Sequence, residues 1–458
     1  MILKSFAVFL PALLAGFGLI QLLWRNDTPL ALALKLFVGI GAGLGIVSCL
    51  YFLRILLLPG QGGYLLIEVI FLALVLIGLL AKERLHFFAL FQRLPLTRIQ
   101  ILLGLAILFV GAVALYFLLI YTRLSPHGDY DAQAIWNLRA RFIYRSRNAW
   151  ENAFSPLINR DFHMDYPLLI PLSVVGGWNT FGSEVLRVPA TLSMLFLCGM
   201  AGIAFSLIAY LRSSSQAAIA VILLLATPGL LLFSTFQTAD IPLTYFFLAS
   251  ASLLVIAGQE SDKGLFFLAG LMAGLSAWTK NEGIPFMILM LLCTMFVFDI
   301  RQRWTQLRSL LAGMALPILT IILFKTLISV NNDLFAENNL SQIIIKLLPP
   351  SRYIQIFVHL LAELLHLGNW PISIIIVLFV YGAILGFKRL EGSAEKVLWL
   401  LPLAQFAVYM LIYVITPHDL EWHLNYSMSR LLIHLFPMAL SSFFLFVNTP
   451  ESVLNKVK

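Results

Sequence analysis

The chain has 458 residues, of which 60% are hydrophobic and only 11% are charged, whereas a soluble protein carries roughly 25% charged residues. Apolar runs of about twenty residues, each long enough to cross the hydrocarbon core of a bilayer, recur from end to end. Because these runs are continuous rather than alternating, they indicate a polytopic helical membrane protein and disfavour a β-barrel. The net charge of +8 lies mainly in short loops, which indicates a topology signal and contact with anionic lipids, not nucleic-acid binding.

The expected fold is all-α, a polytopic bundle of about thirteen transmembrane helices with amphipathic helices on its surface. The predicted spans cover residues 2–23, 30–57, 63–81, 100–121, 187–211, 216–233, 240–258, 264–279, 283–299, 308–329, 370–387, 396–416 and 430–448. The hydrophilic stretches 122–166 and 330–369 mix apolar and polar residues in a helical rhythm, which predicts helices lying on the membrane surface. The cysteines are expected to pack within apolar runs, at Cys49, Cys198 and Cys293.

Lysine and arginine set the predicted orientation, because basic loops favour the cytoplasm. The basic segments are 82–98, 301–308, 388–389 and the tail that carries Lys456 and Lys458. The alternating spans then bring the segments richest in acids, histidine and aromatic residues to the outer side, namely 122–166, 237–240, 279–283, 330–369 and 416–430. This arrangement requires that the short apolar segment 167–182 does not cross, so it is predicted to be a re-entrant or surface helix.

The first outer loop carries two acids, Asp129 and Asp131, directly after an apolar span. A carboxylate in this place, leading into an amphipathic helix over 131–146, is suited to act as general base on an incoming hydroxyl, and Asp131 is the preferred candidate. Two acids two residues apart are also compatible with a divalent cation held through oxygen ligands. The plainer interpretation is that both acids pair with the arginines that follow, of which Arg139 lies two turns after Asp131.

A second cluster in the same loop runs from Asp161 to Pro167 and contains His163 and Asp165. Pro167 suits the first turn of a following helix, and Asp165 would then lie near its N-cap. The functional alternative is that His163 and Asp165 face Asp131 across a cavity.

Lys280 and Glu282 lie where one apolar span ends and the next begins. A lysine in this place can reach a phosphate held at the membrane surface, or its side chain can simply extend to the interface. Asp240, at the start of another span, is suited either to helix capping or to lining a site.

The last outer loop contains His423 and ends at Arg430, which begins the final span. Positive-inside statistics disfavour an arginine on the outer side, so Arg430 is expected to have an anionic partner. His434, three turns after His423, is expected to be a packed histidine within the span rather than a ligand.

Four motifs in this order resemble the GT-C superfamily of membrane glycosyltransferases, which includes protein O-mannosyltransferases, aminoarabinose transferases of lipid A and bacterial Rgt-like enzymes. They are the outer-loop acid before an amphipathic helix at 131–141, the Asp-Tyr-Pro-Leu turn at 165–168 with 182–189, the Trp-Thr-Lys-Asn-Glu-Gly sequence at 278–283, and the late Arg-Leu-Leu at 430–432. No Walker loop, zinc motif or Gly-x-Ser-x-Gly sequence is present.

The resemblance implies an inverting sugar transfer from a polyprenyl-phosphate carrier to an acceptor hydroxyl on a glycan, lipid or protein. Asp131, in preference to Asp129, would be the base. The site is expected on the outer face of the bacterial inner membrane. Binding of the substrate and its lipid phosphate would fall to Lys280, Glu282, Arg430, His163, Asp165, Asp240, Arg139 and His423. No cofactor is required by the resemblance, although Mg²⁺ or Mn²⁺ is compatible with it. Family members usually carry an Asp-Glu pair, whereas Ala132 follows Asp131 here.

The expected organisation is therefore an accessory set of helices over 1–99, a catalytic core over 100–448 with outer loops at 122–186 and 330–369, and a cytoplasmic tail over 449–458. The alternative from another class is a flippase or transporter of a polyprenyl-linked lipid. A transporter more often places its polar groups near the middle of the membrane than on one face.

Overall fold

The computed structural model describes residues 2–58, 62–84, 97–146, 149–155, 157–158, 163–298, 303–328, 340–388 and 392–452. Within these ranges the protein is helical without any strand, and its one isolated β-bridge pairs Phe387 with Val447. The all-α prediction is confirmed. The expectations that concern Asp161, residues 85–96, 301–302, 330–339 and 453–458, and Arg389 fall outside the described residues.

The N-terminal part consists of α1 (Ile2–Ala7), α2 (Leu10–Leu23), α3 (Pro29–Leu57), α4 (Tyr64–Ala81) and α5 (Arg98–Leu124). The sequence marks several of these starts: a proline occupies the first turn of α2 and of α3, and Thr97 with Gln100 forms a capping box before α5. Helices α2 and α3 pack on each other and reach α12, and α3 also packs on α8. The N-terminal helices therefore share the apolar core of the later ones.

The first loop predicted to lie outside, 122–186, folds into η2 (Ala132–Trp136), α6 (Asn137–Arg145), η3 (Trp150–Phe154) and α7 (Leu169–Phe181). The helix expected over 131–146 is present as one turn of π-helix that continues into α6. Helix α7 has 13 residues, which at about 1.5 Å per residue is shorter than a bilayer. Because α2 and α18 are of similar length, the expectation that this segment does not span stays a prediction.

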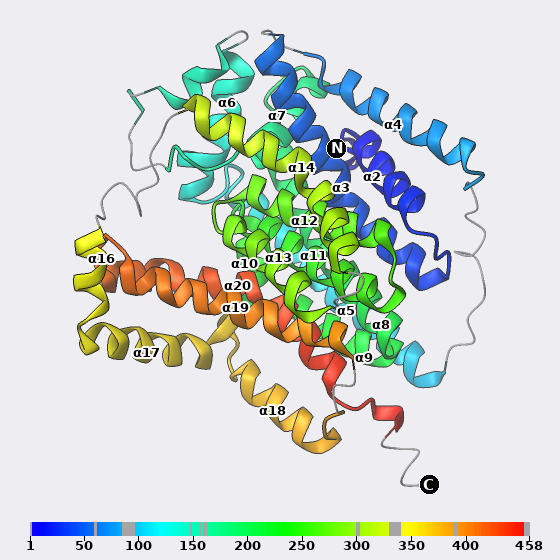
Figure 1. Cartoon of the computed structure of the whole chain (residues 1–458), viewed down its shortest axis with the longest axis vertical. Coiled ribbons are helices and arrows are strands. Elements are labelled where there is room, and N and C mark those ends of the chain that lie inside the picture. The colour runs from blue at the N-terminus through cyan, green and yellow to red at the C-terminus, as the bar shows by residue number, and fades with distance from the viewer. Residues whose placement is uncertain are drawn as a thin grey trace.

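The centre of the molecule is formed by α8 (Arg187–Leu211), α9 (Ser214–Leu225), α10 (Pro228–Thr235), α11 (Asp240–Glu260), α12 (Lys263–Thr279), α13 (Gly283–Val297) and α14 (Arg303–Ile328). Helix α11 lies in the middle of this group (Figure 1), and 94% of its most apolar window is buried. The chain bends by 60° between α9 and α10, where Pro228 interrupts the hydrogen-bond pattern. Helix α11 begins buried at Asp240, whereas its last residues, Gln259 and Glu260, are exposed.

The C-terminal part comprises α16 (Leu340–Leu347), α17 (Pro350–Leu365), η5 (Leu367–Asn369), α18 (Ile374–Leu385), α19 (Ser393–Ile415) and α20 (Leu420–Phe446). Helix α17 lies along α19 and α20 at one side of the molecule (Figure 1), and α18 leaves it at an angle of 82°. Helix α20 runs from an exposed beginning into the central bundle, where it packs on α11 and α8.

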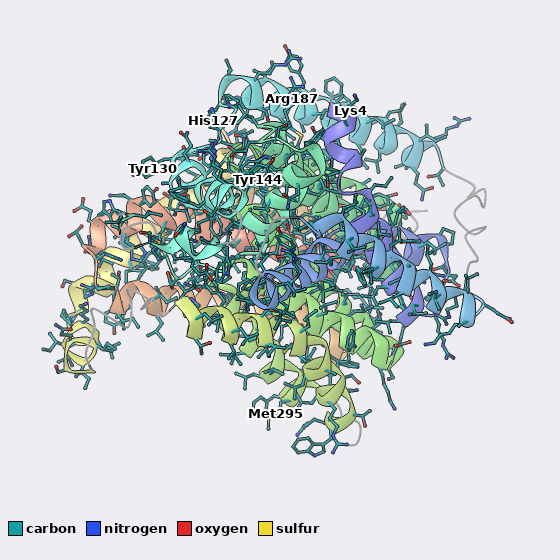
Figure 2. All side chains as sticks on the ribbon, turned by 90° about the horizontal axis from the view of Figure 1, so that it is seen from above. Lys4, His127, Tyr130, Tyr144, Arg187 and Met295 are labelled. Atoms are coloured by element: carbon teal, nitrogen blue, oxygen red, sulfur yellow. The ribbon has the colours of Figure 1, made fainter. Side chains whose placement is uncertain are left out.

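Among the described residues, 8 helices are long and apolar enough to cross a membrane, or up to 10 if each bent pair counts as one span. Three shorter apolar helices, α2, α12 and α13, complete the set. The predicted spans overlap these helices and bent pairs, and 370–387 corresponds to α18 alone, the second half of its pair. The protein is therefore a multi-pass membrane protein. Seen from above, His127 and Tyr130 of the first outer loop lie far from Met295 of α13 (Figure 2).

Candidate active site

The turn that precedes Asp131 is fastened to the turn that precedes α11. Gly128 has φ +77°, and a Cβ atom on it would lie 2.5 Å from the carbonyl oxygen of Phe236, so only glycine fits here. The amide of Asp129 donates to the same Phe236 oxygen at 3.1 Å. The side chain of Asn137 donates to that of Gln237 at 3.0 Å. These contacts bring the acid of the outer loop next to the start of α11.

Arg430 joins the two acids that meet at this place. Its Nη1 donates to Oδ2 of Asp131 at 2.6 Å, and its Nη2 donates to Oδ2 of Asp240 at 2.8 Å. The hydroxyl of Tyr426, one turn earlier on α20, donates to the other oxygen of Asp131 at 3.1 Å. Arg430 thus has the anionic partner expected for it. The Asp131 side chain is 12% exposed and that of Asp240 is 1% exposed, so the pair runs from the surface inward.

Asp240 also holds the lysine of the α12–α13 loop. The Nζ of Lys280 lies 3.1 Å from Oδ1 of Asp240 and 2.8 Å from Oε1 of Glu282. His434 places its Nε2 2.9 Å from the same Asp240 oxygen. Three carboxylates, of Asp131, Asp240 and Glu282, therefore surround the cations Lys280 and Arg430. Asp240, the most buried of the three, lies in the centre.

The tight turn after Lys280 explains how two charges enter a buried loop. A Cβ atom on Gly283 would lie 2.2 Å from the backbone of Ser276, so α13 begins against the end of α12. Burial lowers the pKa of Lys280, but Asp240 and Glu282 outweigh it, and the pKa lies above its ordinary value. Burial raises the pKa of Glu282, and the Lys280 ammonium outweighs it, so that pKa lies below its ordinary value. Both groups are therefore charged at neutral pH.

Asp165 contacts the same loop from the other side. The side-chain amide of Asn281 donates to Oδ2 of Asp165 at 2.5 Å, and the Nζ of Lys325 lies 3.4 Å from that oxygen. Lys325 also donates to the Asn281 side-chain oxygen at 3.0 Å. Asp165 is thus linked to the Lys280 loop through Asn281, and it does not cap α7, whose N-cap residue is Leu168. The alternative, that His163 and Asp165 face Asp131 across a cavity, stays a prediction.

His163 and Arg139 shape the wall beside Lys280. The rings of His163 and Trp136 stack on that of Tyr166, with centroids 4.8 and 5.4 Å away. Arg139 donates to the backbone carbonyls of His163 and Tyr166. Its guanidinium is buried, which lowers its pKa to about 10 although Asp165 raises it. The Nζ of Lys280 lies 5.7 Å from the centre of the Tyr166 ring, which completes the wall.

Two other predicted residues lie at the periphery of this network. Asp129 is exposed, in contrast to Asp131. His423 accepts or donates a 2.8 Å hydrogen bond with the hydroxyl of Thr416, and its ring packs on Tyr413. Among the described residues, no group of three or more His, Cys, Asp or Glu side chains is placed to hold a metal ion.

The sequence prediction did not identify two members of the network, His434 and Lys325. His434 is fully buried, as expected of a packed histidine, and it also bonds Asp240. Its position four residues after Arg430 puts both side chains on one face of α20, which is the signal that could have found it. Lys325 lies in an apolar run, where a charged side chain itself suggests a role.

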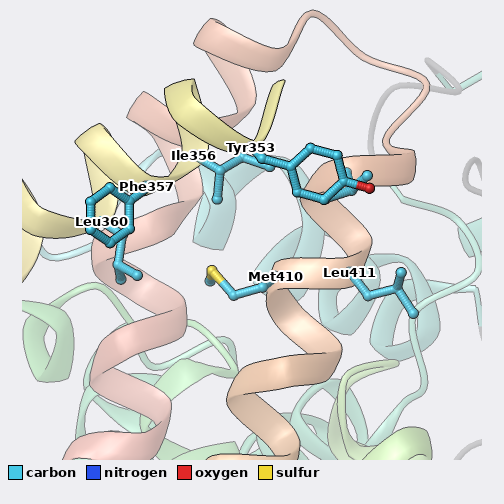
Figure 3. A pocket seen from close by; sticks show the side chains of 7 residues that line it. Tyr353, Ile356, Phe357, Leu360, Met410 and Leu411 are labelled. Carbon is cyan, nitrogen blue, oxygen red and sulfur yellow. The ribbon is translucent and has the colours of Figure 1, made fainter. Parts of the chain in front are cut away.

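An apolar pocket of about 350 Å³ lies between α17 and α19 (Figure 3). Its lining is formed by Tyr353, Ile356, Phe357, Leu360, Met410, Leu411 and Val414. The next residue before Val414, Tyr413, bonds Ser427 of α20 at 2.8 Å, and Ser427 follows Tyr426 directly. The pocket residue Val414 is therefore adjacent in sequence to a contact between α19 and α20.

Residues 172–328 match the family model described as dolichyl-phosphate-mannose-protein mannosyltransferase. This match confirms the resemblance to membrane glycosyltransferases of the GT-C type. The matched segment runs from α7 to α14 and contains Asp240, Lys280 and Glu282, whereas Asp131 and Arg430 lie outside it. No curated protein and no solved structure matches the chain significantly.

Proposed function

We propose that this protein transfers a sugar from a polyprenyl-phosphate carrier to an acceptor hydroxyl at the outer face of a bacterial inner membrane. The observation that carries the proposal is the position of Asp131. It is a nearly buried carboxylate at the surface end of an ion network, held by Arg430 at 2.6 Å and by Tyr426 at 3.1 Å. A base must meet both solvent-borne acceptor and membrane-borne donor, and this place lies between them.

Asp131 is assigned the role of general base. The acceptor oxygen attacks the anomeric carbon from the side opposite the phosphate, and its proton passes to Asp131. The bond between the anomeric carbon and the phosphate oxygen breaks, so the configuration inverts and polyprenyl phosphate leaves. Arg430 and Tyr426 hold the Asp131 carboxylate in a fixed position, from which it can accept the proton.

Lys280 and Arg430 are assigned to the phosphate of the donor. Charge grows on the phosphate oxygens as the sugar leaves, and fixed cations lower the energy of that state. Both cations are neutralised by carboxylates in the structure. A phosphate that binds them must therefore replace at least one carboxylate contact, and Glu282, 17% exposed, is the partner most easily turned outward.

The prenyl chain of the donor is assigned to the apolar pocket between α17 and α19. Its lining consists of apolar side chains and one tyrosine, which suits a hydrocarbon chain. Val414 of the pocket directly follows Tyr413, which bonds Ser427 of α20. A prenyl chain held in the pocket can therefore present its phosphate toward α20.

The test compares Asp131→Asn with Asp129→Asn in purified protein in nanodiscs, with sugar transfer from a polyprenyl-phosphate donor as the measurement. Asp131→Asn keeps the shape of the side chain but cannot take the proton, so transfer should fall by about 10²–10⁴-fold. Asp129→Asn changes an exposed acid and should retain most activity. A dead Asp129→Asn beside an active Asp131→Asn would reverse the assignment. If both variants keep full transfer, the enzyme assignment is wrong, and lipid translocation in proteoliposomes then tests the flippase alternative.

A further inference from the structure

The beginning of α20 exposes two large aromatic side chains beside the candidate base. Trp422 is 54% exposed and Tyr426 is 48% exposed, whereas Trp24, Trp136, Trp178 and Trp278 are buried. The two rings lie 5.5 Å apart between centroids and are inclined by only 7°. Parallel rings in direct overlap would be about 3.5 Å apart, so these are offset, and each leaves part of its face uncovered.

These rings belong to a series with a spacing of four residues on α20, which consists of Trp422, Tyr426, Arg430 and His434. His418 continues the spacing just before the helix begins at Leu420. Residues four apart on a helix are neighbours on its surface. Successive contacts link the series: the His418 and Trp422 rings lie 5.7 Å apart, and the Arg430 guanidinium lies 5.9 Å from the Tyr426 ring. One face of α20 therefore leads from exposed aromatic rings to the carboxylates of the site.

Tyr426 connects this aromatic surface directly with Asp131, because its hydroxyl donates the 3.1 Å bond to the carboxylate. A molecule that rests on the exposed rings thus lies next to the group proposed to take its proton. The rings are bordered by polar side chains. These include Glu421, which is exposed, and Asn425, whose Oδ1 lies 3.2 Å from Nε2 of His359 on α17.

We propose that Trp422 and Tyr426 form an acceptor subsite for a saccharide, so that the attacking hydroxyl belongs to a glycan. This inference rests on the proposed sugar transfer. One face of a pyranose ring presents C–H groups, which are attracted to the negative face of an aromatic ring, while the hydroxyls at its edge require hydrogen-bond partners. An exposed aromatic surface with a polar border offers both. A hydrocarbon chain would need no polar border, and an extended peptide needs no flat ring surface.

The test measures binding of three neutral trisaccharides, mannotriose, maltotriose and chitotriose, to the full-length protein in nanodiscs by saturation-transfer NMR. A serine- and threonine-containing peptide serves as the competing acceptor type. At least one trisaccharide should bind wild-type protein, and Trp422→Leu should weaken that binding by about tenfold. Trp422→Phe, which keeps an aromatic face, should restore most of it. Trp304→Leu is the matched control, because Trp304 is 67% exposed on α14, away from α20.

Binding of the trisaccharides does not involve the donor, so this inference and the proposed function can fail separately. Absence of trisaccharide binding in wild-type protein, or equal binding by Trp422→Leu and wild type, overturns the saccharide subsite. Binding of the peptide alone, with loss in Trp422→Leu, also overturns it and assigns the surface to a protein acceptor. Trisaccharide binding that depends on Trp422, without any sugar transfer by wild-type protein, supports the subsite and contradicts the transferase proposal.

Discussion

Each end of α11 is surrounded by a polar cluster built around a buried lysine, and the two clusters differ in kind. At the Asp240 end, Lys280 lies between Asp240 and Glu282. At the Glu260 end, the Nζ of Lys35 donates to Asp27 and to Gln21, both at 2.8 Å. The 21 residues of α11 separate the two ends by roughly 30 Å. Burial of a lysine is therefore common to both and does not distinguish a site from a scaffold.

The Lys35 cluster links the ends of neighbouring helices through hydrogen bonds. Glu260 accepts hydrogen bonds from Trp24 at 2.9 Å and from the hydroxyl of Tyr210 at 2.5 Å, which ties the end of α2 to the ends of α8 and α11. Burial raises the pKa of Asp27, but the Lys35 ammonium outweighs it and holds that pKa below its ordinary value. Lys35 forms an ion pair with Asp27, whereas the hydrogen bonds to Glu260 come from neutral side chains.

The Lys280 cluster is a chain of linked ion pairs with a route to the surface. Asp131, Asp240 and Glu282 surround Arg430 and Lys280, and the outermost acid lies beside exposed aromatic rings. In the Lys35 cluster, by contrast, Lys35 forms one ion pair, with Asp27. The comparison teaches that a chain of linked ion pairs beside exposed aromatic rings, not burial of a lysine, indicates the candidate site.

The largest effect is expected from Asp240→Asn. This change leaves Arg430 and Lys280 without their shared carboxylate, and breaking such a buried arrangement costs about 3–5 kcal/mol of unfolding free energy. Transfer should also be lost, because both cations lose their position. Asp131→Asn is the matched control: Arg430 keeps Asp240, so transfer should fall with little loss of thermal stability. Equal melting temperatures for the two variants would contradict the central role of Asp240.

Asp27→Asn should separate stability from activity. Lys35 would remain buried with neutral partners only, and because Asp27 itself is 41% exposed, the expected loss is at the low end, about 2–3 kcal/mol. Thermal unfolding should show this loss, whereas sugar transfer per folded molecule should equal that of wild type. If the folded molecules of Asp27→Asn transfer sugar more slowly than wild type, the Lys35 end also belongs to the functional machinery.

The sequence predicts the parts of this site that depend on one segment and misses those that depend on contacts between helices. Apolar runs define the helices because each must cross a hydrocarbon layer. The predicted position of Arg430 on the outer side, where arginine is disfavoured, predicts an anionic partner. The identity of that partner is beyond the sequence, because Asp131 and Asp240 meet Arg430 only after three separate segments pack. For the same reason Lys325 and His434 were not assigned to the site, and the contact between Asp165 and Asn281 was not predicted.

Lys280→Met should weaken binding of polyprenyl phosphate by about tenfold to a hundredfold, which corresponds to about 1.5–3 kcal/mol for hydrogen bonds to a charged group. The single change also leaves Glu282 buried beside an apolar side chain. The double variant Lys280→Met/Glu282→Gln removes that penalty, so its thermal stability should recover while lipid binding stays weak. Titration with polyprenyl phosphate in nanodiscs measures the difference. Recovery of lipid binding in the double variant would show that Lys280 neutralises Glu282 and does not bind the phosphate.

The smallest effect concerns Glu68 of α4, a buried acid that differs from those of both clusters. Its side chain is fully buried, and neither carboxylate oxygen has a hydrogen-bond partner among the described residues. A buried polar group without a partner costs about 1–3 kcal/mol, so Glu68→Met, of similar size and apolar, should raise the free energy of unfolding by about 1 kcal/mol. Glu68→Gln keeps a polar group in the same place and should gain less. Thermal unfolding of both variants beside wild type measures the effect, and transfer should be unchanged because α4 does not contact the site network. If Glu68→Met instead lowers the free energy of unfolding, the Glu68 carboxyl has a hydrogen-bond partner in the membrane-embedded protein, as Asp240 does.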